Sequence, residues 1–115
     1  MTSKEIINAI SVCRLSVQDE KETQEQLERI FIVNQIRYER EYRLDKKNIP
    51  DFFIDGIAIE LKIKGTAKKI YRQCERYCGF EQVKELILIT NRSMGFPADI
   101  NGKPCYIINI GRAWL

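Results

Sequence analysis

The chain contains no histidine, and this absence removes several kinds of functional site. Without an imidazole there is no Ser-His or Cys-His nucleophilic pair, no site of the His-Asn-His type and no histidine-ligated zinc. A metal ion bound by this protein would need oxygen ligands, and oxygen ligands favour Mg²⁺ or Mn²⁺.

Long hydrophobic runs are absent as well. No apolar stretch approaches the length of a membrane span, so we expect no membrane partner. Residues 1–5 show no charged segment followed by an apolar one, which predicts that there is no secretory signal. The expected location is therefore cytoplasmic and reducing, where the four cysteines would be free thiols (Cys13, Cys74, Cys78 and Cys105).

The length and composition of the chain predict one small domain over residues 1–115. Hydrophobic residues make up 44% of the chain, enough for a core without disulfide bonds. The net charge of +3 is unevenly spread, because residues 1–35 hold four basic and six acidic residues and residues 36–115 hold fifteen and ten. A basic second part is expected of a phosphate-binding face, although many mildly basic domains bind no nucleic acid.

Hydrophobic periodicity predicts two helices at the start of the chain, over residues 3–15 and about 21–35. Thr2 and Glu5 can form a capping box for the first helix. Residues 37–44 alternate and predict a strand with one solvated face. The residues expected on one face of this strand are Tyr38, Arg40, Tyr42 and Leu44.

The rest of the chain predicts two more strands of a meander and then a helix. The strands are expected at 52–54 and 57–64, joined by an Asp55-Gly56 hairpin turn. The helix is expected from Thr66, as its N-terminal cap, to about Cys78, with Gly79 as the C-terminal cap.

The C-terminal part reads as a buried strand at 86–90, a loop at 91–104 with a tight turn at 101–102, and a last strand at 105–110. Trp114 is expected to pack against a hydrophobic surface or a partner subunit. This order of elements predicts an α/β fold of the α+β kind, with a mixed β-sheet flanked by helices.

Three charged residues in the meander stand out. Asp51 ends one apolar run, and nine residues later Glu60 and Lys62 lie two apart on the next strand, hence on one face. The hairpin can fold Asp51 back beside them. Two carboxylates that converge repel each other unless a cation lies between them. The pattern therefore indicates a metal site with a lysine placed to stabilise phosphate charge.

The chemistry of such a site is phosphodiester hydrolysis by a metal-activated water. Asp51 and Glu60 would bind Mg²⁺ or Mn²⁺, with the main-chain carbonyl of Leu61 as an additional ligand. Lys62 would orient or deprotonate the water, or neutralise the developing phosphate charge. A nearby dication lowers the pKa of a lysine and two carboxylates raise it, and the sequence leaves the balance open.

Pro50-Asp51 followed by Glu60-Leu61-Lys62 resembles the signature of the PD-(D/E)XK nuclease superfamily. The resemblance covers roughly residues 21–92 and implies a restriction-endonuclease-like core of αβββαβ order. Gln73 and Tyr77 match the Q-x-x-x-Y motif of the RecB-like branch, and their spacing of four places both on one helix face. No iron–sulfur pattern or helicase domain accompanies the motif, so the resemblance is to a compact, stand-alone member of the phage or prophage type.

The resemblance also implies roles for individual residues. Gln73 and Tyr77 would hold the DNA strand or order the site. A glutamate on the first core helix would bind the metal through water, and Glu25 is our choice, with Glu22 and Glu28 as rivals.

Structural readings compete with these roles. Glu60 and Lys62 could form a solvated ion pair, but Asp51 and the Gln73–Tyr77 pair favour a site. Asp55 is explained by its turn. The basic residues after the lysine strand would either follow the phosphates of a substrate or make an ordinary charged surface, namely Lys64, Lys68, Lys69, Arg72 and Arg76.

The sequence thus favours a Mg²⁺-dependent deoxyribonuclease. One alternative is a non-catalytic module of the same fold that binds nucleic acid or assembles with partners. A second alternative is a dimeric endonuclease similar to Holliday-junction resolvases. The expected partners are single- or double-stranded DNA, together with a second copy of the chain or a recombination or replication protein.

Overall fold

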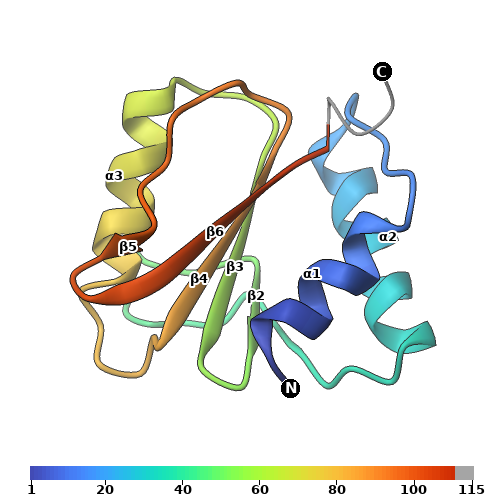
Figure 1. The fold of residues 1–115 in the computed structure, drawn as a ribbon, viewed down its shortest axis with the longest axis horizontal. Coiled ribbons are helices and arrows are strands. Elements are labelled where there is room, and N and C mark those ends of the chain that lie inside the picture. The colour runs from blue at the N-terminus through green and yellow to red at the C-terminus, as the bar shows by residue number, and fades with distance from the viewer. Residues whose placement is uncertain (111–115) are drawn as a thin grey trace.

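The computed structural model describes residues 1–110, so Trp114 lies outside the described residues. Three helices and six strands follow one another along this part of the chain (Figure 1). Their bounds are α1 Ser3–Ser11, α2 Glu20–Val33, β1 Glu39–Arg40, β2 Phe52–Ile54, β3 Ile57–Lys62, α3 Ala67–Tyr77, β4 Glu85–Thr90, β5 Asp99–Ile100 and β6 Lys103–Asn109.

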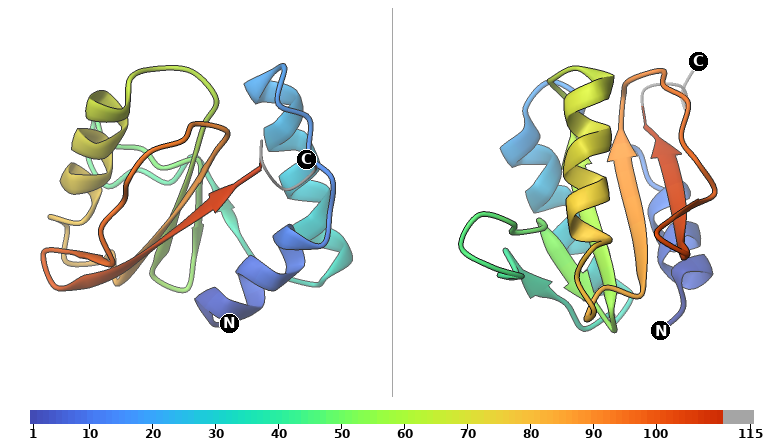
Figure 2. Two further views of the ribbon diagram at one scale, coloured as in Figure 1. Left: turned by 45° about the horizontal axis from the view of Figure 1, so that its top comes forward. Right: turned by 90° about the vertical axis from the view of Figure 1, so that its left-hand side faces the viewer.

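The six strands form one mixed sheet in the order β1-β2-β3-β4-β6-β5. Strands β1, β2 and β3 are antiparallel, β4 runs parallel to both β3 and β6, and β5 pairs antiparallel with β6. Helices α1 and α2 cover one face of the sheet and α3 covers the other (Figures 1 and 2). The predicted mixed sheet flanked by helices is therefore confirmed.

Each face of the sheet packs a separate hydrophobic core. Phe31 of α2 and Phe52 of β2 lie in the first core, under α1 and α2, with their rings 5.2 Å apart and nearly perpendicular. Cys74 and Tyr77 of α3 lie in the second, together with Leu88 of β4. No helix within residues 1–110 has the length and apolar character needed to cross a membrane.

The helices begin as predicted but end earlier. The capping box of Thr2 and Glu5 is present, and Thr66 caps α3 by accepting a hydrogen bond from the Lys69 N–H. Helix α1 ends at Ser11 rather than residue 15. The expected cap at Gly79 is wrong, because α3 ends in a right-handed turn capped by Cys78 and needs no left-handed residue there.

The expected strand over 37–44 is confirmed only at Glu39–Arg40. Glu41 has a φ of +52°, a left-handed conformation that interrupts the extended chain. As a result the predicted single face is wrong. Tyr38 packs into the first core with Phe31, whereas Tyr42 stacks on Phe53 at 4.1 Å, on the side of the second core.

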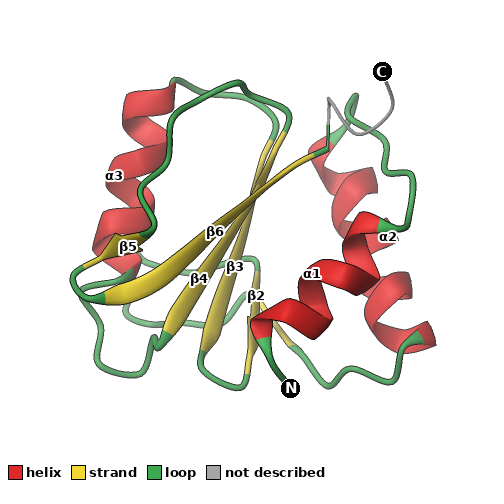
Figure 3. Ribbon diagram, viewed as in Figure 1, coloured by secondary structure: helices red, strands yellow, loops and turns green. Residues whose placement is uncertain are grey.

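The two hairpin turns are where the sequence places them (Figure 3). Asp55 and Gly56, like Asn101 and Gly102, all have positive φ, as a two-residue turn between antiparallel strands requires. The loop predicted at 91–104 nevertheless contains the short strand β5, which pairs with Lys103 and Pro104 at the start of β6.

Strand β3 is buried on both faces. Ile57, Ile59 and Leu61 face the first core. On the opposite face Ala58 packs under α3 and Glu60 keeps only 3% of its surface exposed. Parallel pairing of β3 with β4 places β3 inside the sheet. Burying the Glu60 carboxylate there costs free energy unless neighbouring groups pair with it.

Candidate active site

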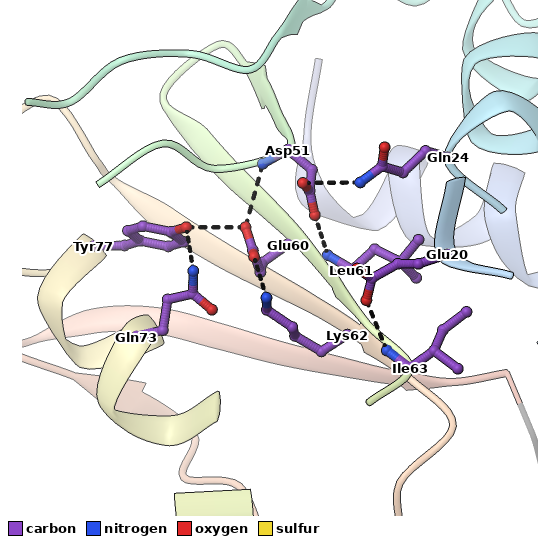
Figure 4. A network of polar contacts seen from close by, with 9 residues as sticks. All are labelled: Glu20, Gln24, Asp51, Glu60, Leu61, Lys62, Ile63, Gln73 and Tyr77. Atoms are coloured by element: carbon purple, nitrogen blue, oxygen red, sulfur yellow. Dashed lines mark hydrogen bonds and ion pairs between the residues drawn. The ribbon is translucent and has the colours of Figure 1, made fainter. Parts of the chain in front are cut away.

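Asp51 and Glu60 meet at the point where β2 begins beside β3 (Figure 4). The main-chain N–H of Asp51 donates to Oε1 of Glu60 across 3.2 Å. The Asp51 carboxylate in turn accepts the main-chain N–H of Leu61 at 2.8 Å. The Asp51 carboxylate thus accepts the Leu61 N–H in place of a main-chain carbonyl of a neighbouring strand. Together the two hydrogen bonds hold Asp51 against β3.

Lys62 lies on the same face of β3 as Glu60, with its Nζ 3.6 Å from Oε2 of Glu60. The two side chains differ in exposure, because Glu60 is buried and Lys62 keeps 29% of its side-chain surface exposed. The ammonium group therefore contacts the buried carboxylate and can also reach a molecule arriving from solvent.

Gln73 and Tyr77 form a hydrogen-bonded connection from α3 to this acid. The Tyr77 hydroxyl donates to Oε1 of Glu60 at 3.1 Å and accepts the Gln73 amide N–H at 2.9 Å. Tyr77 is fully buried, so its ring fills the second core while its hydroxyl reaches the site. The spacing of four predicted this pair, and the structure connects it to Glu60.

Helix α2 presents Glu20 and Gln24 to the site rather than Glu25. Gln24 donates its amide N–H to Oδ1 of Asp51 at 3.0 Å, and Glu20 accepts the main-chain N–H of Ile63 at 3.0 Å. Glu25 is exposed, and so is Glu22. The sequence carries a signal for the right face, because Glu20, Gln24 and Glu28 are spaced four apart on the helix.

Arg40 continues this network at the edge of the sheet. Its guanidinium donates to Oε1 of Gln24 at 2.7 Å and to Oε1 of Glu28 at 2.6 Å. It also lies 5.4 Å from the centre of the Phe52 ring. Gln24 therefore bridges Arg40 and Asp51, a relation that strand alternation alone could not reveal.

The predicted basic residues are spread over three hollows, and Lys68 lines one of them together with Arg72. Lys69, Arg72 and Arg76 line a hollow of about 380 Å³ with Gln73, beside the hydrogen-bonded pair on α3. Arg76 is tied to Asn48 at 3.1 Å. Lys64 is exposed and lines a different hollow, next to Glu20 and Ile63.

The surroundings of Asp51 and Glu60 disfavour the charged form of both carboxylates. Burial raises the pKa of Glu60 well above its usual range, and the neighbouring Asp51 raises it further. Burial also raises the pKa of Asp51, with Glu20 adding to the effect. The Leu61 N–H, Lys62 and Arg40 offset only part of the rise in Asp51. One buried acid and one partly buried acid that resist being charged together provide a place for a cation.

Asp51 and Glu60 would hold a hard cation through oxygen atoms only, as the absence of histidine requires. Within residues 1–110 no cluster of three or more acidic or thiol side chains is suited to a metal. Mg²⁺ is commonly bound by one or two carboxylates with water completing its shell, so the pair fits. The N–H and C=O of one strand residue point to the same side, and the Leu61 carbonyl is therefore expected on the side of Asp51.

Comparison with known proteins adds no further assignment. No family model, no curated protein and no solved structure matches this chain. The function of this protein must therefore be inferred from the contacts of Asp51, Glu60 and Lys62 and from the residues that hold them.

Proposed function

We propose that this protein is a metal-dependent nuclease that hydrolyses DNA phosphodiester bonds with Mg²⁺ or Mn²⁺. The observation that carries the proposal is the partly buried contact of the Asp51 main chain with the Glu60 carboxylate, with the Lys62 ammonium 3.6 Å from Glu60. A dication bound by this pair supplies an activated water and neutralises charge on the phosphate.

Each surrounding residue has a task in this proposal. Lys62 holds the attacking water or a phosphate oxygen, because its ammonium is partly exposed. Tyr77 fixes the orientation of Glu60, and Gln73 fixes the Tyr77 hydroxyl. Gln24 fixes Asp51 from the other side of the sheet. Carboxylates oriented in this way lose little freedom when a cation binds.

The resemblance to PD-(D/E)XK nucleases of the RecB-like branch supports the same function. We propose that α2, β1, β2, β3, α3 and β4 form a restriction-endonuclease-like core. The succession of one helix, three strands, one helix and one strand over these elements supports this proposal. The motif residues Asp51, Glu60 and Lys62 come from neighbouring strands of this core, and Gln73 and Tyr77 come from α3.

The test is cleavage of linear, circular and branched DNA with Mg²⁺, with Mn²⁺ and with a chelator. Asp51→Asn and Lys62→Met should reduce cleavage by roughly a hundredfold or more, the loss common for groups that stabilise charge in a transition state. The matched controls are Asp99→Asn and Lys4→Met, which change the same residue types at exposed positions of β5 and α1. Equal cleavage by the site variants and the controls would refute the proposal.

The same assay separates the alternatives. Salt-sensitive DNA binding without divalent-dependent cleavage would support the non-catalytic module. Paired nicking of a four-way junction by a dimer would support the resolvase-like endonuclease. We favour the hydrolase over the binding module because Asp51, Glu60 and Lys62 are all present, with Asp51 hydrogen-bonded to Glu60 and Lys62 paired with Glu60.

A further inference from the structure

A second hollow lies on α3 next to the proposed active site. It measures about 500 Å³, within the range of ligand-binding pockets, and is lined mainly by helix α3 and by residues 93–95 of the loop before β5. Its lining residues are Ala67, Lys68, Tyr71, Arg72, Glu75, Ser93, Met94 and Gly95. None of these residues belongs to the group that binds or orients Asp51 and Glu60.

The lining combines an apolar part with cations. Tyr71 and Met94 are partly buried and pack on the second core, where the Tyr71 ring meets Phe96 edge-on at 6.4 Å. Lys68 and Arg72 are exposed around it, against a single acid, Glu75. An aromatic side chain next to exposed cations is the combination that accepts a planar base with its phosphate.

Arg72 joins this hollow to the active site. It lines the 500 Å³ hollow with Tyr71, and it also lines the hollow of Lys69, Gln73 and Arg76. Gln73 then leads through Tyr77 to Glu60. A phosphate backbone that passes over Arg72 would therefore have a basic hollow on the side of the carboxylates and an apolar hollow on the other side.

We propose that the hollow of Tyr71 and Met94 binds an unstacked base of single-stranded DNA while Lys68 and Arg72 hold its phosphates. This inference deepens the proposed nuclease function and depends on it for the identity of the ligand. In a duplex the bases are stacked inside and unavailable to such a hollow, whereas a single strand offers every base face. The substrate is thus a single strand or a frayed end.

Gly95 provides a sharp test because a Cβ built there meets no atom within 4 Å. Gly95→Leu would add an uncharged, branched side chain to the lining of the hollow, and its Cβ would displace no neighbour. Tyr71→Leu removes the aromatic surface instead. The matched control is Ala98→Leu, which adds a similar bulk at an exposed position of the same loop, outside the lining.

The measurement is fluorescence anisotropy of labelled oligothymidylate and of a matching blunt duplex, in a chelator so that no cleavage occurs. We expect Gly95→Leu and Tyr71→Leu to weaken single-strand binding by roughly tenfold, the lower range for one stacked base, with little change for the duplex. Ala98→Leu should bind both like the parent. Equal single-strand affinities in all four proteins would overturn the inference, and the inference alone if the parent still cleaves DNA with Mg²⁺. Hollow-dependent binding without any metal-dependent cleavage would support the inference and overturn the nuclease.

Discussion

Tyr77 and Glu60 are joined by a buried hydrogen bond of 3.1 Å, which connects helix α3 to strand β3 across the second core. This bond makes the core residue Tyr77 part of the site. It also explains the four-residue spacing of Gln73 and Tyr77, because Gln73 occupies the remaining acceptor position of the Tyr77 hydroxyl.

Tyr77→Phe should therefore impair the site more than the fold. Removal of the hydroxyl leaves the ring in the core, so the free energy of unfolding should fall by only about 1 kcal/mol. Metal affinity or cleavage rate should fall by roughly ten- to a hundredfold, as for other residues that orient metal ligands. Isothermal titration with Mn²⁺ and a cleavage assay measure the two effects. Tyr42→Phe, whose ring stacks on Phe53, is the control, and an equal loss in both variants would contradict the assignment.

Two of the four glutamates of α2, Glu20 and Glu25, provide a comparison between the sequence and the structure. Glu20→Gln should reduce cleavage several-fold, because its carboxylate lies beside Ile63 and contributes to the electrostatic environment of Asp51. Glu25→Gln should have little effect, since Glu25 is exposed. The reverse result in a cleavage assay would restore Glu25 as the metal-assisting glutamate.

The bridge from Arg40 through Gln24 to Asp51 should determine how well Asp51 is held. Gln24→Leu keeps the volume but leaves the Asp51 Oδ1 without this donor and Arg40 without one acceptor. We expect a loss of about 1–3 kcal/mol in the free energy of unfolding, the cost of unpaired buried polar groups. Urea denaturation measures the loss. The control is Gln18→Leu, because Gln18 is exposed. Gln26→Leu would be unsuitable, since Gln26 accepts the Ser16 N–H.

The raised pKa values predict that the metal-free protein is less stable at mildly alkaline pH than at mildly acidic pH. Burial raises the pKa of Asp51 to about 6 and that of Glu60 to about 8, so the folded state binds more protons than the unfolded state. The free energy of unfolding should then fall as the pH rises from about 4 through these values. Thermal denaturation in a chelator at several pH values tests this, and a rise in Tm from pH 5 to pH 8.5 would contradict it.

Glu60→Gln should remove the part of this pH dependence that comes from Glu60. The amide cannot ionise, so at pH 8 without metal the variant should melt several degrees above the parent, while cleavage is lost. Mg²⁺ should stabilise the parent more at pH 8 than at pH 5, because the cation competes with protons for the carboxylates. A variant that melts below the parent at pH 8 would show that the Glu60 charge is fully compensated in the fold.

The sequence predicted most of the contacts at the candidate site because the relevant signals are local. Glu60 and Lys62 are two apart on a strand, Gln73 and Tyr77 are four apart on a helix, and one turn at Asp55-Gly56 returns Asp51 to Glu60. Glu20, Gln24 and Arg40 were missed because their contacts join segments distant in sequence. The spacing of four puts Glu20, Gln24 and Glu28 on one face of α2, but which of these side chains reaches Asp51 depends on how α2 packs against the sheet.

The fold was predicted in outline for the same reason, and its errors have identifiable physical causes. Alternation in β3 gave the correct residues for the first core, but the burial of the opposite face depends on where α3 lies. The strand at 37–44 failed because nothing in its alternation signals a left-handed residue at Glu41.

Glu41 has a consequence for the way the edge of the sheet comes apart. The residue just before it, Arg40, contacts Phe52 under α2, and the residue just after it, Tyr42, stacks on Phe53 on the opposite side. The short segment from Arg40 to Tyr42 thus contacts residues on both faces of the sheet. Detaching it would expose the two cores together, so amide protons in α2 and α3 near this edge are expected to exchange with solvent in a single concerted event.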